Sequence, residues 1–191
     1  VAPTAPFAWA LAGVVAINGL SYSMYNRAIR SSDLSLVIPL LAFTPVWMLA
    51  TSKWMLGESP RPASVAGILL IVAGTLALKP EGTRGILGPL RALADDRGAR
   101  IMMAVALLWS ITANLDKIAI TATTATTYLI AFQLAFAVTF LPAVLQPARR
   151  QQIRVHWRGL VLLGTLAAGM WIAQFLALRL TLAPYVIAMK R

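Results

Sequence analysis

The chain contains no cysteine, one histidine and only six aspartate or glutamate residues among 191. Without cysteine it can form neither disulfide bonds nor thiolate metal sites. Charged residues make up 12% of the chain, about half of the share that is usual in soluble domains. Hydrophobic residues make up 59%, and the mean hydropathy is +0.76. This balance excludes an ordinary soluble domain and predicts a membrane protein.

Apolar windows of about 20 residues, the length that crosses a bilayer as a helix, follow one another along the chain. Membrane strands would alternate apolar and polar residues over about ten positions, and these windows do not. We therefore predict an all-α, polytopic bundle of membrane helices. The predicted spans cover about residues 7–29, 34–58, 62–78, 101–120, 126–145 and 157–180, and a further helix begins at Pro184.

The span at residues 34–58 carries Pro39 and Pro45 in its interior. Proline costs about 3 kcal/mol inside a helix because it lacks the N–H group and its ring clashes with the preceding turn. In a membrane such prolines are typical of broken helices that line an enclosed cavity, where the freed carbonyl groups find partners other than lipid. We predict a broken helix here.

The next span carries Gly67 and Gly74, which are seven residues apart and so lie on one helical face. Small residues on one face of a membrane helix allow a neighbouring helix to approach closely. The pattern predicts a packing role for this face.

Seventeen lysine and arginine residues give a formal net charge of +11. These cations lie between apolar spans rather than along one face, which argues against nucleic-acid binding and favours contact with lipid headgroups. Residues 147–158 are predicted to form a basic loop with His156 at headgroup level. Most cations fall on the side of that loop, and the positive-inside rule makes this side cytoplasmic.

Two segments of the chain resemble each other at an offset of 149 residues. Residues 28–39 match residues 177–188 at Ala28 with Ala177, Arg30 with Arg179, Val37 with Val186 and Ile38 with Ile187. Extending the offset predicts an intact protein of roughly 280 residues with about ten spans, five in each half. Because five is an odd number, the two halves are expected to lie inverted in the membrane, a design that is typical of transporters.

Several short motifs support this interpretation: Tyr25-x-x-Ala28, Leu34-Ser35-Leu36, Pro45, Leu56-Gly57-Glu58, Gly67 and Gly74, with Trp109-Ser110 and Tyr185-Val186 in the second half. Together they resemble the EamA-type domain of the drug/metabolite transporter superfamily. The resemblance implies a multi-pass carrier in the inner (plasma) membrane, often an exporter of amino acids, metabolites or drugs.

On this interpretation the chain is incomplete at both ends and holds about helices 3 to 8 and the start of helix 9 of the family's ten. Residues 1–79 are expected to end the first repeat, residues 80–100 to form a polar linker, and residues 101–191 to begin the second repeat. The family's usual topology has both termini in the cytoplasm, which puts the linker outside. The count of positive charges predicts the opposite orientation.

Polar and aromatic side chains inside the spans predict a substrate cavity, because each unsatisfied polar group in lipid costs several kcal/mol. Hydrogen bonding between helices is the alternative role for each of them. Tyr25 and Gln174 correspond under the repeat offset and are expected on opposite sides of the cavity. The candidates are Tyr22, Tyr25, Asn26, Pro45, Trp109, Asn114, Gln133, Trp171 and Gln174.

Asp116 is the one acid that the predicted spans allow within the bilayer. Ionisable groups at that depth are functional candidates by default, so Asp116 is a candidate for proton coupling. The alternative is that Asp116 and Lys117 mark the solvated end of the fourth span. The sequence contains no paired carboxylates, no metal-ligand spacing and no nucleophile with a plausible base, so we predict no enzyme, cofactor or metal site.

Two classes of function stay open. The first is a secondary transporter that moves small organic solutes by alternating access between the two halves. The second is a polytopic membrane protein that does not transport, such as a lipid-handling enzyme or an assembly subunit. Candidate residues that line a cavity favour the first class, and candidate residues paired with one another favour the second. The expected partners are a small-molecule substrate and membrane lipids; a homodimer stays open.

Overall fold

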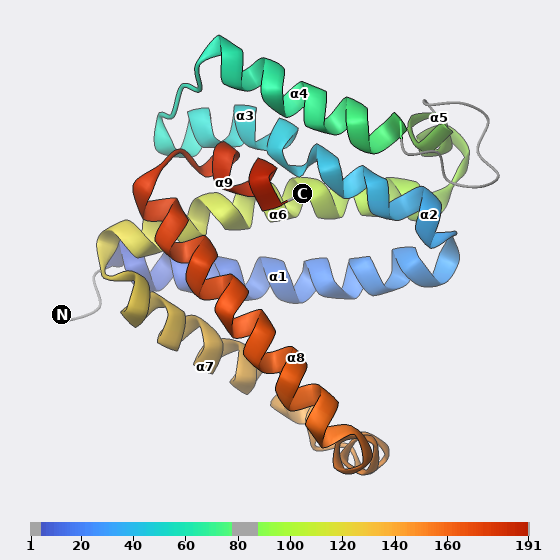
Figure 1. Ribbon diagram of the computed structural model, residues 1–191. Helices are drawn as coiled ribbons and strands as arrows, with labels where there is room; N and C mark the ends of the chain where they lie inside the picture. Colours follow the sequence, from blue (N-terminus) through green and yellow to red (C-terminus); the bar gives the residue numbers. More distant parts are fainter. Residues whose placement is uncertain (1–4, 78–87, 191) are drawn as a thin grey trace. The chain divides into compact units, whose positions relative to one another are not determined.

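The computed structural model describes residues 5–77 and 88–190, and every element within these ranges is a helix (Figure 1). This confirms the predicted all-α class. Residues 80–87 of the predicted linker lie outside the described residues. The elements are α1 (Ala5–Ser31), α2 (Leu34–Val37), the 3-10 helix η1 (Ile38–Phe43), α3 (Thr44–Leu56), α4 (Pro62–Ala77), α5 (Gly88–Asp95), α6 (Arg97–Ala122), α7 (Ala125–Val144), α8 (Pro147–Leu180) and α9 (Ala183–Lys190).

Five helical stretches of the described residues are long and apolar enough to cross a membrane, which confirms a polytopic bundle. Helix α4 is a shorter apolar helix. The five stretches are Ala5–Ser31, Leu34–Leu56, Arg97–Ala122, Ala125–Val144 and Arg149–Leu180.

The chain folds into two compact units. We call residues 16–115 and 181–191 the α3 unit, and residues 1–15 and 116–180 the α7–α8 unit. Helices α1 and α6 each contribute one part to each unit.

In the α3 unit, the second span is broken as its prolines predict. The six residues of η1 separate α2 from α3, with Pro39 in η1 and Pro45 in the first turn of α3. These positions suit proline because the first N–H groups of a helix have no partner within it. The hydroxyl of Thr44 donates to the carbonyl oxygen of Leu41 at 2.7 Å, so one carbonyl at the break is satisfied without lipid.

The core of the α3 unit lies around this broken span. One buried cluster joins α1, α2 and η1 to the first half of α6, and a smaller cluster joins η1 to α4. Helix α9 packs against α3 and α4 (Figure 1). The first cluster contains Ala28, Val37, Leu40, Leu41, Ala99, Met102, Val105 and Ala106.

A group of hydrogen bonds around Asp96 lies next to this core, at the start of α6. The Ser32 hydroxyl donates to Oδ1 of Asp96 at 2.6 Å, and the same oxygen accepts from the backbone N–H of Ala99 at 2.7 Å. The Ser32 bond, and then the backbone N–H groups, hold the pKa of Asp96 below the ordinary 3.8 for this carboxyl. Asp96 is therefore ionised at neutral pH and caps the N-terminus of α6.

The α7–α8 unit is built on a contact between α7 and α8. Its core is aromatic, with Tyr128, Phe132, Trp171 and Phe175 in edge-on and tilted contacts at centroid distances between 4.9 and 5.9 Å. Phe132 and Phe175 suit a membrane interior because their rings carry no polar group, and the hydroxyl of Tyr128 has a partner in Asp116.

Residues 147–158 correct one prediction. They were expected to form a basic loop, but α8 already begins at Pro147. A kink follows at His156, where the backbone leaves the helical region with φ −108° and ψ 18°. The stretch contains arginine and glutamine, which are good helix formers, so its polarity does not stop the helix.

The close approach expected at Gly67 and Gly74 is also absent among the described residues. A Cβ atom added at either glycine meets no atom within 4 Å. The close approach occurs instead at Gly98, where an added Cβ would lie 2.2 Å from Oγ of Ser32 and 3.0 Å from the carbonyl oxygen of Ala28. The start of α6 thus contacts the end of α1 without room for a side chain.

Gly98→Ala is expected to destabilise the protein. Forcing a methyl group into a packed contact costs about 1–3 kcal/mol, which exceeds the roughly 0.5–1 kcal/mol that alanine gains over glycine in a helix. We expect a lower midpoint of thermal unfolding for the purified protein in detergent.

Gly74→Ala is the matched control, because its added methyl group meets open space. It is expected to leave the midpoint unchanged or to raise it slightly. Equal midpoints for Gly98→Ala and Gly74→Ala would show that the contact with Ser32 is not tight in solution.

Candidate functional site

The candidate residues from the sequence are divided between the two units. Tyr22, Tyr25, Asn26, Pro45, Trp109 and Asn114 belong to the α3 unit, whereas Gln133, Trp171, Gln174 and Asp116 belong to the α7–α8 unit.

Three aromatic candidates of the α3 unit lie together. The ring of Trp109 on α6 is stacked with Tyr25 of α1 at a centroid distance of 5.7 Å, and Tyr22 meets it at 6.1 Å with its ring tilted by 63°. Tyr22 and Tyr25 are three residues apart and so point from one face of α1. We call these three residues the Trp109 cluster; all are half-buried.

A polar group lies on α3 and α6. The Asn114 side-chain N–H donates to the hydroxyl of Thr51 at 2.9 Å, and the Thr51 hydroxyl lies 3.4 Å from that of Ser110. Ser110 and Asn114 are four residues apart, so they share one face of α6. We call Thr51, Ser110 and Asn114 the Asn114 cluster.

The Asn114 side chain is fully buried, yet its carbonyl oxygen Oδ1 has no hydrogen-bond partner among the described residues. A buried acceptor without a partner costs about 1–3 kcal/mol. Buried polar atoms are paired in the great majority of cases, so an exception of this kind calls for a reason. A donor group on a bound molecule is one such reason.

Asp116 corrects another expectation. It was weighed as the solvated end of the fourth span, but α6 continues to Ala122 and the side chain of Asp116 is only 3% exposed. Its Oδ1 accepts a short hydrogen bond from the hydroxyl of Tyr128 on α7. Tyr128 is itself buried against Phe7 and Phe175. The carboxyl group is therefore bonded to a tyrosine whose ring packs in the aromatic core.

The other candidates have more ordinary surroundings. Asn26 and Gln133 are exposed, and Pro45 is buried at the break in the second span. Trp171 packs in the aromatic core of the α7–α8 unit, and Gln174 is 7% exposed on the same helix. Tyr25 and Gln174 belong to different units, so their predicted symmetry about a cavity stays a prediction.

A small cavity lies between α7 and α8. Its volume is about 40 Å³, enough for a water molecule but not for an organic solute. It is lined by Ala125, Thr126, Leu129, Ile172, Phe175 and Leu176. Among the described residues, no group of three histidine, aspartate or glutamate side chains is placed to hold a metal ion.

Residues outside the set of site candidates link two distant parts of the chain. Oε2 of Glu58, after α3, accepts from the backbone N–H of Ala183 at 3.0 Å, and the hydroxyl of Tyr185 accepts from the N–H of Arg61 at 3.2 Å. These partners are 125 and 124 residues apart. Glu58 and Tyr185 belong to the quoted motifs, so the structure gives those motifs a role in joining α9 to the turn between α3 and α4.

Together, the apolar helices define a multi-pass α-helical membrane protein. The model of the EamA-like transporter family matches residues 2–78. This match confirms the resemblance to the EamA type of the drug/metabolite transporter superfamily; residues 79–191 lie outside it. The matched family is a family of membrane transporters. Comparisons with the curated proteins and with the solved structures give no match.

Tyr128→Phe is expected to destabilise the α7–α8 unit. The change keeps the aromatic ring but removes the hydrogen bond to a buried carboxyl group, at a cost of about 1–3 kcal/mol. The measurement is the midpoint of thermal unfolding in detergent.

Tyr25→Phe is the control for this prediction. It removes the same hydroxyl group from a tyrosine that contacts Trp109 through its ring, and we expect a smaller change. If both variants unfold at the same temperature, the bond between Tyr128 and Asp116 contributes nothing measurable.

Proposed function

We propose that the protein is a secondary transporter that exports small organic solutes, such as amino acids, metabolites or drugs, across the inner (plasma) membrane. The family match over residues 2–78 supports membrane transport as the class. The observation on which the binding site rests is the buried Oδ1 of Asn114, which has no partner among the described residues.

In this proposal, the Trp109 and Asn114 clusters form one part of the solute site. Each cluster has members on α6 within the α3 unit, where Trp109 of the first cluster is adjacent to Ser110 of the second. Oδ1 of Asn114 accepts a hydrogen bond from an N–H or O–H group of the solute, which removes the cost of the unpaired oxygen. The rings of Trp109, Tyr22 and Tyr25 bind its apolar or aromatic part. No side chain of the two clusters carries a fixed charge.

The broken second span supplies a hinge for alternating access. A stretch of 3-10 helix within a membrane span often marks a hinge, because its hydrogen bonds have poorer geometry than those of an α-helix. Here η1 connects α2 to α3, and Thr51 of the Asn114 cluster lies on α3. A change in the angle at η1 moves Thr51 relative to α6 and so opens or closes the Asn114 cluster.

Asp116 is the proposed site of proton coupling. It is the only acid in the sequence of the α7–α8 unit, and it is buried with Tyr128 as a hydrogen-bond donor. A carboxyl group with little access to water changes its charge only when the surrounding helices move. Binding and release of a proton are then tied to the conformation of the protein.

A protein that does not transport is the alternative, and a specific observation favours it. Candidate residues pair within the protein: Tyr22 and Tyr25 contact Trp109, Asn114 donates to Thr51, and Asp116 accepts from Tyr128. Such pairs also stabilise the bundle of a membrane protein without a solute pathway. Transport measurements separate the two functions.

The test of transport uses the full-length protein in liposomes that are loaded with a mixture of radiolabelled amino acids. We expect faster efflux than from equally loaded liposomes that lack the protein. Asn114→Ala removes the acceptor and is expected to weaken solute binding by about 10- to 100-fold, seen as a raised KM. Trp109→Ala is expected to lower efflux by a similar factor.

Trp54→Ala is the control, because Trp54 lies on α3 and is 87% exposed. It is expected to leave efflux unchanged. The proposed site is wrong if Trp54→Ala and Trp109→Ala lower efflux equally. Absence of efflux for amino acids, and likewise for cationic dyes as a second class of probe, would favour the alternative function.

Proton coupling is tested with an imposed pH gradient across the same liposomes. Asp116→Asn is expected to abolish the acceleration by the gradient while exchange of solute at equal pH continues. The exposed Asp33 serves as the control through Asp33→Asn, which is expected to keep the acceleration. If Asp116→Asn retains both the rate and its dependence on pH, Asp116 does not couple transport to protons.

A further inference from the structure

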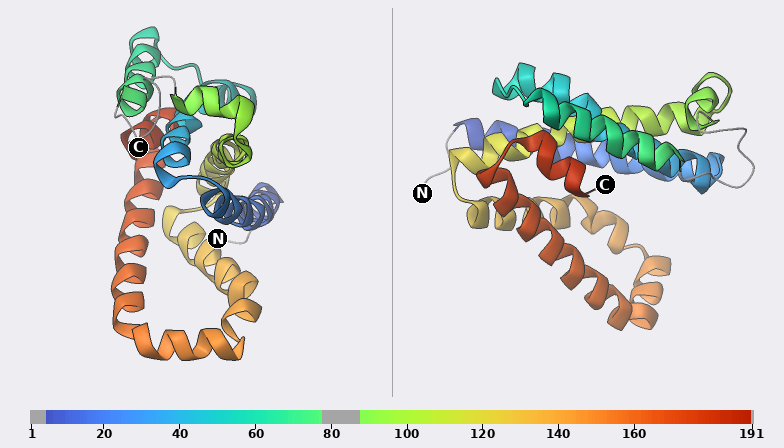
Figure 2. Two further views of the ribbon diagram at one scale, coloured as in Figure 1. Left: turned by 90° about the vertical axis from the view of Figure 1, so that its right-hand side faces the viewer. Right: turned by 45° about the horizontal axis from the view of Figure 1, so that its top comes forward.

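The first part of α8 lies across the ends of two spans. In the left view of Figure 2, residues 147–156 run across from the lower end of α7 to the lower end of the rest of α8. The kink at His156 makes this turn. A helix that crosses the ends of two membrane spans lies in the plane of the interface rather than in the hydrocarbon core. We call residues 147–156 the transverse segment.

The transverse segment is strongly basic. Arg149, Arg150 and Arg154 lie on it, Arg158 follows the kink, and all four side chains are exposed. The sequence from residue 117 to residue 191 contains no aspartate or glutamate, and the one acid of the α7–α8 unit, Asp116, is buried with Tyr128. The arginines therefore have no acidic partner within their own unit.

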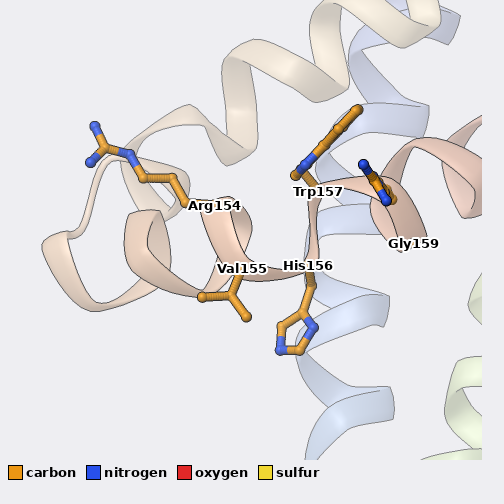
Figure 3. Close-up of a pocket in the computed structure, with 6 residues that line it drawn as sticks. Arg154, Val155, His156, Trp157 and Gly159 are labelled. Atoms are coloured by element: carbon orange, nitrogen blue, oxygen red, sulfur yellow. The ribbon is translucent and has the colours of Figure 1, made fainter.

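The kink forms a pocket of about 420 Å³ next to these charges. Figure 3 shows that Trp157 leaves the backbone on one side, whereas Val155 and His156 leave it on the other. The guanidinium group of Arg158 lies over the Trp157 ring at 5.6 Å from its centroid, and Gly159 adds no side chain. The lining residues are Arg154, Val155, His156, Trp157, Arg158 and Gly159.

The residues after the pocket fix its depth in the membrane. Leu160, Val161, Leu162 and Leu163 are all exposed, between 46% and 64%. Four consecutive exposed apolar residues cover the whole circumference of the helix, so this part of α8 faces lipid tails. Trp157 lies at the boundary, where tryptophan is enriched in membrane proteins. The pocket is therefore at the level of the headgroups.

We propose that the pocket at the kink of α8 binds the headgroup phosphate of an anionic phospholipid. Arg154 and Arg158 supply the positive charge, and guanidinium groups bind phosphate oxygens well because their N–H groups match them in pairs. The acyl chains of the same lipid lie along the exposed leucines that follow. A free phosphate ion lacks these chains, so the site favours the lipid over the ion.

The test is native mass spectrometry of the full-length protein taken from nanodiscs of phosphatidylcholine with one fifth phosphatidylglycerol. We expect the protein to retain phosphatidylglycerol in preference to phosphatidylcholine. Arg154→Gln with Arg158→Gln is expected to weaken retention by roughly tenfold or more, because each arginine near an anionic surface contributes about a fivefold factor. Inorganic phosphate at millimolar concentration is expected not to release the lipid.

Arg179→Gln is the matched control, because Arg179 is also exposed and lies at the other end of α8. It is expected to leave retention unchanged. Circular dichroism confirms that each variant is folded. The proposal is overturned if phosphatidylcholine is retained equally, if the double variant binds like the control, or if inorganic phosphate displaces the lipid.

Discussion

Lipid tails offer no hydrogen bonds, so each polar group within the bilayer needs a partner from the protein itself. The described residues satisfy this constraint in several ways. The hydroxyls of Ser21 and Ser52 donate to carbonyl groups four residues earlier on their own helices. Thr44 satisfies a carbonyl at the break in the second span, and Tyr128 donates to Asp116. Oδ1 of Asn114 is the exception, and for this reason it carries more information about function than the polar atoms that are paired.

The same constraint explains how the two halves of the chain are joined. The start of α9 has backbone N–H groups that need acceptors, and Glu58 supplies one from a turn 125 residues earlier in the chain. Helix α9 packs on α3, so segments far apart in the sequence are in direct contact. The motif residues Glu58 and Tyr185 hold this contact.

Local signals in the sequence predicted the fold well. The lengths of the apolar windows gave the order of the spans, and Pro39 and Pro45 predicted the break that η1 forms.

Long-range pairs could not be predicted in this way. Asp116 and Lys117 together resemble a helix end, and only the position of Tyr128 shows that the carboxyl group is buried. Thr51 and Ser110 were not among the candidates, because hydroxyls in membrane helices commonly bond their own backbone. Asn114 bonds Thr51 across 63 positions of the chain, and Thr51 bonds Ser110 across 59. The transverse segment was missed because its polarity was given more weight than the helix propensity of its residues.

The length of the transverse segment also sets the distance between the far ends of α7 and α8. Its ten residues are about 15 Å long at the usual rise of an α-helix, and they join the far ends of α7 and α8, whose near ends meet through Phe132, Trp171 and Phe175. The two spans therefore diverge from their near ends to their far ends (Figure 2). The separation of the far ends depends on the number of residues between Pro147 and the kink at His156. The length of a basic helix at the surface thus determines how far apart the two spans end.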